Sequence, residues 1–129
     1  MQMHRFSHLV LALLPSLVVA QEAGTINGKW SATFQGTGGG NREAELTITD
    51  SGGIWRTFAR GNQAKNNKCL GKEFPVDFQT RSAAELVFEV KASTVMQGCT
   101  DMSVNAKSTD GRTFDGVIRE GSPIKLVRQ

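Results

Sequence analysis

The chain has 129 residues, with 15 Lys and Arg, 12 Asp and Glu, two histidines and no tyrosine. Both histidines, His4 and His8, lie in residues 1–20, which have the pattern of an export signal. Its removal leaves 109 residues with no imidazole, no phenol and a net charge of +2, which excludes Ser–His and Cys–His nucleophiles and histidine metal sites. We therefore expect no metal and no cofactor.

The first predicted element is a secretory signal peptide. Arg5 supplies the positive start, residues 9–19 are mainly apolar, and small or β-branched residues precede a cleavage site after Ala20. Eleven residues, about 16 Å as a helix, are too few to span the ~30 Å hydrocarbon core of a membrane. The next residue, Gln21, is not the cysteine that a lipid anchor requires. We expect a periplasmic or secreted product with no membrane span.

Residues 21–129 are predicted to form a single β domain. Clusters rich in Gly, Asn and Asp recur about every 8–12 residues, which is typical of all-β proteins. Between the clusters apolar residues alternate with period two, and no segment keeps a helical period for about ten residues. The predicted strands are residues 26–35, 43–50, 53–60, 73–81, 84–93, 101–108, 112–120 and 123–128.

Each strand except 53–60 has one apolar and one polar face, as in antiparallel sheets with one side on a core. Short hairpin connections favour an eight-stranded up-and-down barrel, with a two-sheet β-sandwich as the alternative. The predicted inward residues are Trp30, Phe34, Leu46, Ile48, Phe74, Val76, Phe78, Leu86, Phe88, Val90, Met102, Val104, Ile118 and Leu126. We expect these large side chains to fill the barrel rather than leave a cavity.

The only cysteines, Cys69 and Cys99, predict one disulfide in an oxidising compartment. Cys69 precedes strand 73–81 and Cys99 follows strand 84–93, so the bridge would close the open end of that hairpin. A structural bridge of this span contributes roughly 3–4 kcal/mol. Redox chemistry is the weaker alternative, because no C-x-x-C pair is present to lower a thiol pKa.

The alternation fails at Trp55 and Arg56. If Ile54 and Phe58 point inward, Arg56 also points inward and Trp55 points to solvent. Three arrangements are open: a β-bulge that returns Trp55 to the core, Arg56 at the mouth of a barrel, or an exposed Trp55 beside Arg56. The last would be a contact site for a sugar or a protein.

Residues 60–72 are the main binding candidate. The segment holds Arg60, Lys65, Lys68 and Lys72, with four amide side chains that include Asn67. It is about twice the usual length of a loop in a compact domain, and long loops on rigid scaffolds often carry binding. These cations and amides suit an anionic or sugar-like surface. The alternative is a solvated loop whose charge keeps the protein soluble.

The acidic residues offer a second kind of site. Glu43 with Glu45, and Glu85 with Glu89, are pairs on outward faces. Paired carboxylates about 5–9 Å apart in a cleft hydrolyse glycosides, but like-facing pairs on one strand are typical of a solvated surface. Nucleic-acid binding is not expected, because a surplus of two charges is small against the roughly six to ten phosphate contacts of a binder.

Gly28-Lys29-Trp30 resembles the Gly-x-Trp start of lipocalin- and avidin-type barrels, in which the Trp packs across one end of the barrel. Avidin-type barrels are lined with polar side chains, whereas the predicted interior here is apolar, so no binding residue is transferred. A wider pattern is similar to small secreted proteobacterial proteins of unknown role and implies compartment and fold only. It comprises Gly28-x-Trp30, Cys69, Pro75-Val76, Gly98-Cys99-x-Asp101 and Gly116.

These observations predict a monomeric, non-enzymatic binding protein whose partner is a protein or an anionic or sugar surface. One alternative is a small exported inhibitor of another protein. Cationic lysozymes are poor targets for it, because electrostatic steering toward them requires an acidic inhibitor. The other alternative is a carboxylate-based hydrolase that uses only Asp or Glu with Arg and Lys.

Overall fold

The computed structural model describes residues 26–36 and 40–129. The expected signal peptide, residues 1–20, and its cleavage site lie outside the described residues. The strands are β1 (Gly28–Gln35), β2 (Asn41–Thr49), β3 (Gly52–Thr57), β4 (Glu73–Arg81), β5 (Glu85–Val90), β6 (Met102–Lys107), β7 (Thr113–Ile118) and β8 (Ser122–Arg128). Three short helical turns join them: α2 (Gln63–Asn66), η1 (Ala92–Thr94) and η2 (Arg119–Gly121).

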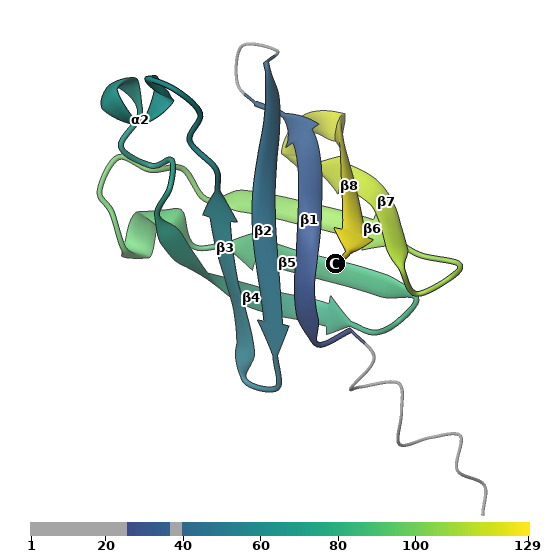
Figure 1. Cartoon of the computed structure of the whole chain (residues 1–129). Helices are drawn as coiled ribbons and strands as arrows, with labels where there is room; N and C mark the ends of the chain where they lie inside the picture. The colour runs from purple at the N-terminus through teal and green to yellow at the C-terminus, as the bar shows by residue number, and fades with distance from the viewer. Residues whose placement is uncertain (1–25, 37–39) are drawn as a thin grey trace, which may run out of the picture.

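The strands pair antiparallel in chain order, and β8 returns to β1 to close a barrel (Figure 1). Ala32 of β1 lies opposite Leu126 of β8 at the closure, and Trp30 lies opposite Arg128. The predicted up-and-down barrel is confirmed, and the β-sandwich alternative is wrong. Among the described residues, no helix has the length and hydropathy needed to cross a membrane.

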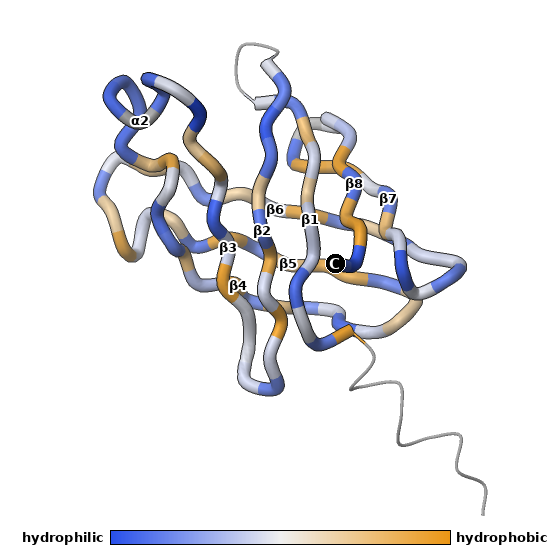
Figure 2. Tube along the Cα trace, viewed as in Figure 1, coloured by the Kyte–Doolittle hydropathy of each residue, from blue (hydrophilic) through white to orange (hydrophobic). Residues whose placement is uncertain are grey.

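The apolar face of each strand points into one core, and Figure 2 shows apolar and polar residues alternating along the strands. Trp30, Trp55, Phe88 and Phe114 are the largest fully buried side chains. The rings of Trp30 and Phe114 meet edge to face with centroids 5.3 Å apart. Burial of each such side chain contributes roughly 1.5–3 kcal/mol relative to exposure. As expected, large side chains fill the middle of the barrel.

Four residues of the predicted interior are only partly buried. Phe34, Met102 and Ile118 stand at or beside strand ends, where the barrel wall no longer surrounds them. Phe78 lies beside the register shift between Phe78 and Thr80 in the β4–β5 pair. All four still pack against the core.

The two ends of the barrel differ. The "Trp30 end" is where β1 begins, and side chains close it. The indole Nε1 of Trp30 donates to the carbonyl oxygen of Ile26 at 2.8 Å. The guanidinium carbon of Arg128 lies 5.4 Å from the centre of the Trp30 ring system, and its Nη2 donates to the carbonyl oxygen of Asn27 at 2.7 Å. Trp30 thus packs across one end of the barrel, as the Gly-x-Trp resemblance predicts.

The opposite "loop end" carries the two longest connections of the described chain. Residues 58–72 join β3 to β4, and residues 91–101 join β5 to β6. The end of β1, the start of β2 and the β7–β8 turn lie at the same end (Figure 1). Long loops therefore gather over one opening of the barrel, whereas side chains seal the other.

Gly116 of β7 lies where the backbone of β6 leaves no room for a side chain. A Cβ atom placed on Gly116 would lie 2.0 Å from the carbonyl oxygen of Asn105 and 2.5 Å from the Cα of Ala106. Both atoms belong to the backbone of β6, so no side-chain rotation relieves the overlap. Any larger residue forces β6 and β7 apart.

Gly116→Ala is expected to lower the free energy of unfolding by about 1–3 kcal/mol or more, because it overpacks a close strand contact. Gly40→Ala is the matched control, since its Cβ would meet no atom within 4 Å. Urea denaturation of both variants measures the difference. Equal small effects at the two positions would contradict the proposed approach of β6 to β7.

Candidate functional site

Residues 58–72 fold into an ordered connection at the loop end. The side-chain oxygen of Gln63 accepts the backbone N–H of Arg60 at 2.9 Å, which fixes the start of α2. Gly61 adopts a φ of 56°, a left-handed conformation that favours glycine. The backbone N–H of Gly71 donates to the carbonyl oxygen of Thr57 at 2.7 Å. The connection therefore returns to the end of β3 before β4 begins.

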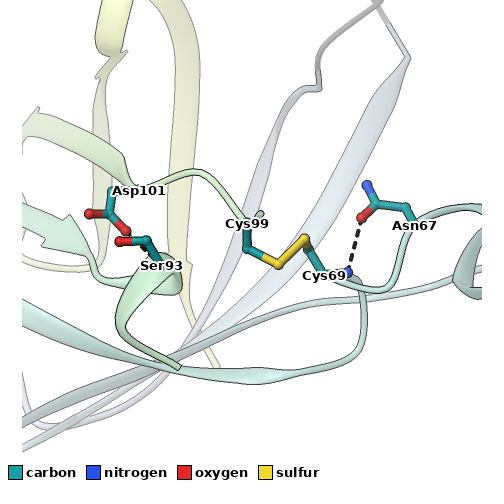
Figure 3. Close-up of a disulfide and its surroundings, with 5 residues drawn as sticks. All are labelled: Asn67, Cys69, Ser93, Cys99 and Asp101. Atoms are coloured by element: carbon teal, nitrogen blue, oxygen red, sulfur yellow. Dashed lines mark hydrogen bonds between the residues drawn. A yellow bond between two sulfur atoms is a disulfide. The ribbon is translucent and has the colours of Figure 1, made fainter. Parts of the chain in front are cut away.

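A disulfide between Cys69 and Cys99 ties the two long connections together (Figure 3). Their Cα atoms are 5.8 Å apart, and the residues are 30 positions apart in the chain. The bridge spans the open end of the β4–β5 hairpin, as predicted. Cys99 is buried in the core cluster, and Leu70 beside Cys69 is also buried. The side-chain oxygen of Asn67 accepts the backbone N–H of Cys69 at 3.0 Å (Figure 3).

The connection between β5 and β6 has its own anchor. The carboxylate of Asp101 accepts the backbone N–H of Ser93 at 2.8 Å, which holds η1 against the start of β6 (Figure 3). This backbone hydrogen bond lowers the pKa of Asp101 below its ordinary value of 3.8, with smaller contributions from Lys91 and Arg119. The connection is therefore held by a charge-assisted hydrogen bond as well as by the disulfide.

The predicted cations are all exposed on residues 58–72. Arg60 forms an ion pair with Glu43 of β2. Lys65, Lys68 and Lys72 are exposed, and none has an ion-pair partner among residues 26–36 and 40–129. We call these three lysines and Arg60 the cationic loop face.

Asn67 and Arg56 have other surroundings. Asn67 uses its side-chain oxygen within the connection, at the backbone of Cys69. Arg56 lies on the outer face of β3, opposite Glu73 and Glu45 of the neighbouring strands, with its guanidinium carbon 5.1 Å from the centre of the Phe58 ring. The arrangement that places Arg56 inward at a barrel mouth is therefore wrong.

Trp55 is a core residue, so the expected exposed contact site is wrong. Its side chain is 2% exposed, whereas Ile54 beside it is 44% exposed. Trp55 lies between Leu46 and Phe74 on the neighbouring strands, and both of these point inward. The β2–β3 register runs without a shift, so the bulge alternative is also wrong. The incorrect premise was that Ile54 points inward.

Beneath the two connections lies a pocket of about 180 Å³, here called the loop-end pocket. Its apolar lining includes Phe34, Trp55, Leu70, Phe74, Ala92 and Met102. Its polar lining includes Arg42, Thr57, Asn67 and Thr100. The expectation of a filled barrel therefore holds for the middle of the barrel and fails at this end.

Arg42 is not among the residues predicted from the sequence, although the strand pattern contains a signal for its position. Arg42 has the same strand parity as Ala44, Leu46 and Ile48, which are buried inside the barrel. Opposite Arg42 stands Phe34, at the end of β1. Extending the β2 alternation by two residues places a guanidinium at the barrel mouth. The strand predicted from the sequence begins at residue 43, so Arg42 falls just outside it.

The described carboxylates lie at or near the surface. No polar or charged residue is buried in the part of the chain that the structure describes. The pKa of Asp110 is lowered by the backbone N–H groups of Arg112 and Thr113, and that of Asp101 is also lowered. A general acid requires the opposite shift. Residues 26–36 and 40–129 also contain no cluster of three or more metal-ligating side chains.

No known protein family matches the chain, and no curated protein matches its sequence. Among solved structures, a redesigned β-barrel is similar to it, with a TM-score of 0.45 and 13% sequence identity. The similarity covers 83% of this chain and 94% of the other.

Replacing both cysteines with serine is expected to lower the free energy of unfolding by about 3–4 kcal/mol, because the unfolded chain regains the freedom of a long loop. Urea denaturation of the variant and of the wild type, each with and without reductant, measures the effect. Reductant should destabilise only the wild type. An unchanged stability on reduction would show that the bridge does not hold the loop end.

The hydrogen bond from Ser93 gives Asp101 a defined pH dependence. A lowered folded-state pKa means that the carboxylate stabilises the fold above the unfolded-state pKa and loses this effect as pH falls through the folded-state pKa. Wild type should therefore protect the Ser93 amide from hydrogen exchange more than Asp101→Asn does near neutral pH. The difference should disappear below the folded-state pKa. A constant difference down to low pH would exclude this carboxylate as its cause.

Proposed function

We propose that the protein is an exported, non-enzymatic binding protein that holds an acidic polysaccharide on its cationic loop face. The observation that carries the proposal is the set of Lys65, Lys68 and Lys72, which are exposed and have no ion-pair partner in the described chain. The signal-peptide pattern of residues 1–20 and the disulfide support export, since disulfides persist in oxidising compartments.

Charge is unevenly distributed along the chain. Residues 56–73 contain five Lys and Arg and one acid, whereas the whole chain has a net charge of only +3. Arg60 is paired with Glu43, and Arg56 lies opposite Glu45 and Glu73. The positive potential of the segment therefore comes mainly from Lys65, Lys68 and Lys72, and it attracts anions and raises their rate of encounter. Scattered charges of the same total would not produce such a region.

The loop is already ordered before a partner arrives. The disulfide, the Gln63 bond to Arg60 and the Gly71 bond to Thr57 all restrict residues 58–72. Preorganisation lowers the entropy lost on binding. An ordered loop can therefore use weak, solvent-exposed charges that a flexible loop would use poorly.

The side-chain types favour an acidic sugar polymer. Lysine ammonium groups are hydrated point charges without the fixed fork of arginine, so they suit repeated carboxylate or sulfate groups on a flexible chain. Asn62 and Asn66 are exposed beside them. Their amides can donate to and accept from sugar hydroxyl groups.

Replacing Lys65, Lys68 and Lys72 together with glutamine is expected to weaken heparin binding by at least about tenfold at low salt, because much of the affinity is electrostatic. Heparin serves as the acidic polysaccharide probe and neutral dextran as its uncharged counterpart. Isothermal titration calorimetry at two salt concentrations measures the affinity of the wild type and of the variant for each polymer. Dextran is expected to bind neither protein.

The matched control replaces Lys29, Lys107 and Lys125 with glutamine, which removes the same charge from exposed positions on β1, β6 and β8. This variant should retain most of the heparin affinity. Equal losses in the two triple variants would show that net charge alone governs binding and would overturn the proposed site. No heparin binding by the wild type would overturn the proposed function.

A further inference from the structure

We propose that the loop-end pocket is a binding site for a small monocarboxylate, whose carboxylate pairs with Arg42 and whose short apolar body fills the pocket. The site lies beneath the cationic loop face and uses different side chains. It does not rest on the proposed function, because neither Lys65, Lys68 nor Lys72 lines the pocket.

The size and walls of the pocket fit one small apolar group. Its volume is about 180 Å³, and an apolar protein cavity of about 150 Å³ is large enough to bind benzene. Phe34 and Trp55 form one wall, with ring centroids 5.8 Å apart. Ala92 and Met102 contribute from the other connection and from β6. An alkyl chain of about six carbons or one aromatic ring would contact these walls.

Arg42 supplies the charge. Its side chain lies along Gly36, so that a Cβ on Gly36 would come within 2.8 Å of its Cγ and 2.9 Å of its Nε. It is partly buried and makes no hydrogen bond or ion pair with any residue of the described chain. The adjacent Glu43 pairs with Arg60 instead. The N–H groups of this planar guanidinium are therefore available to the two oxygens of a carboxylate, whose geometry they match.

The other polar groups of the pocket offer donors. The hydroxyl oxygen of Thr57 accepts the indole Nε1–H of Trp55 at 2.9 Å, so its own proton remains available to donate. The side-chain oxygen of Asn67 is occupied by the backbone N–H of Cys69, which leaves its NH₂ group. No Asp or Glu lines the pocket. This set favours a ligand that accepts hydrogen bonds and disfavours an amine.

The two tryptophans provide a reporter and a control within one molecule. The indole N–H of Trp55 lies at the pocket, and that of Trp30 bonds to Ile26 at the opposite end of the barrel. Titration of the ¹⁵N-labelled, oxidised protein with hexanoate should shift the Trp55 indole resonance and leave that of Trp30 unchanged. Hexanol should bind at least about tenfold more weakly, and hexylamine should not bind.

Variants test the two parts of the site. Arg42→Met keeps an unbranched apolar stem and removes the guanidinium, and we expect it to weaken hexanoate binding at least about tenfold while hexanol binding stays the same. Arg112→Met removes an exposed charge near the Trp30 end and should change neither affinity. Ala92→Leu should abolish the binding of both hexanoate and hexanol, because the larger side chain fills the pocket. The Trp30 resonance reports whether each variant is folded.

Three outcomes would overturn the proposal. The first is no shift of the Trp55 resonance with hexanoate up to about 10 mM. The second is equal affinity for hexanoate and hexylamine. The third is hexanoate binding that Arg42→Met leaves unchanged in a folded protein. The heparin affinity of the triple lysine variant has no bearing on these three outcomes. The polysaccharide proposal and the monocarboxylate proposal can therefore be overturned independently.

Discussion

The pairing of β8 with β1 is the constraint on which the rest of this structure depends. It removes both sheet edges and turns the apolar faces of eight strands onto one interior. A barrel of eight strands is just wide enough for side chains to fill it, and Trp30, Leu46, Phe88 and Phe114 occupy its middle. Closure therefore leaves space for a ligand only near the ends, where strands give way to connections.

The two ends of the barrel are covered by different kinds of structure. At the Trp30 end, an indole, the Arg128 guanidinium and the preceding residues Ile26 and Asn27 cover the opening directly. At the loop end, two connections joined by Cys69 and Cys99 contribute residues over the opening, above strand residues such as Phe34 and Trp55. A cover made of loops follows the interior less closely than packed rings do. The loop-end pocket is the space that remains below it.

Period-two alternation was sufficient to place seven of the eight strands, because each buries one face, and the even cysteine count was sufficient for the disulfide. The strand predicted over residues 53–60 was ambiguous. Alternation failed at Ile54 and Trp55, where two apolar residues are adjacent and only pairing with Leu46 and Phe74 decides which points inward. It also missed Arg42. Its inward position depends on how far β2 extends past the core, and that length is set by pairing with β1.

The cations of the loop end act in two physical environments. Lys65, Lys68 and Lys72 stand in water, where salt screens charges over about 8 Å at physiological ionic strength. Arg42 is partly buried beside apolar rings, where salt screens charge less, and its side chain has lost hydration without a hydrogen-bond or ion-pair partner among the described residues. Contacts at the lysines must therefore be broad and salt-sensitive, whereas a contact at Arg42 is local and depends on ligand shape. The disulfide-linked connections thus separate an exposed cationic surface from a sheltered pocket at one end of a small barrel, and the two proposed sites would use these two environments.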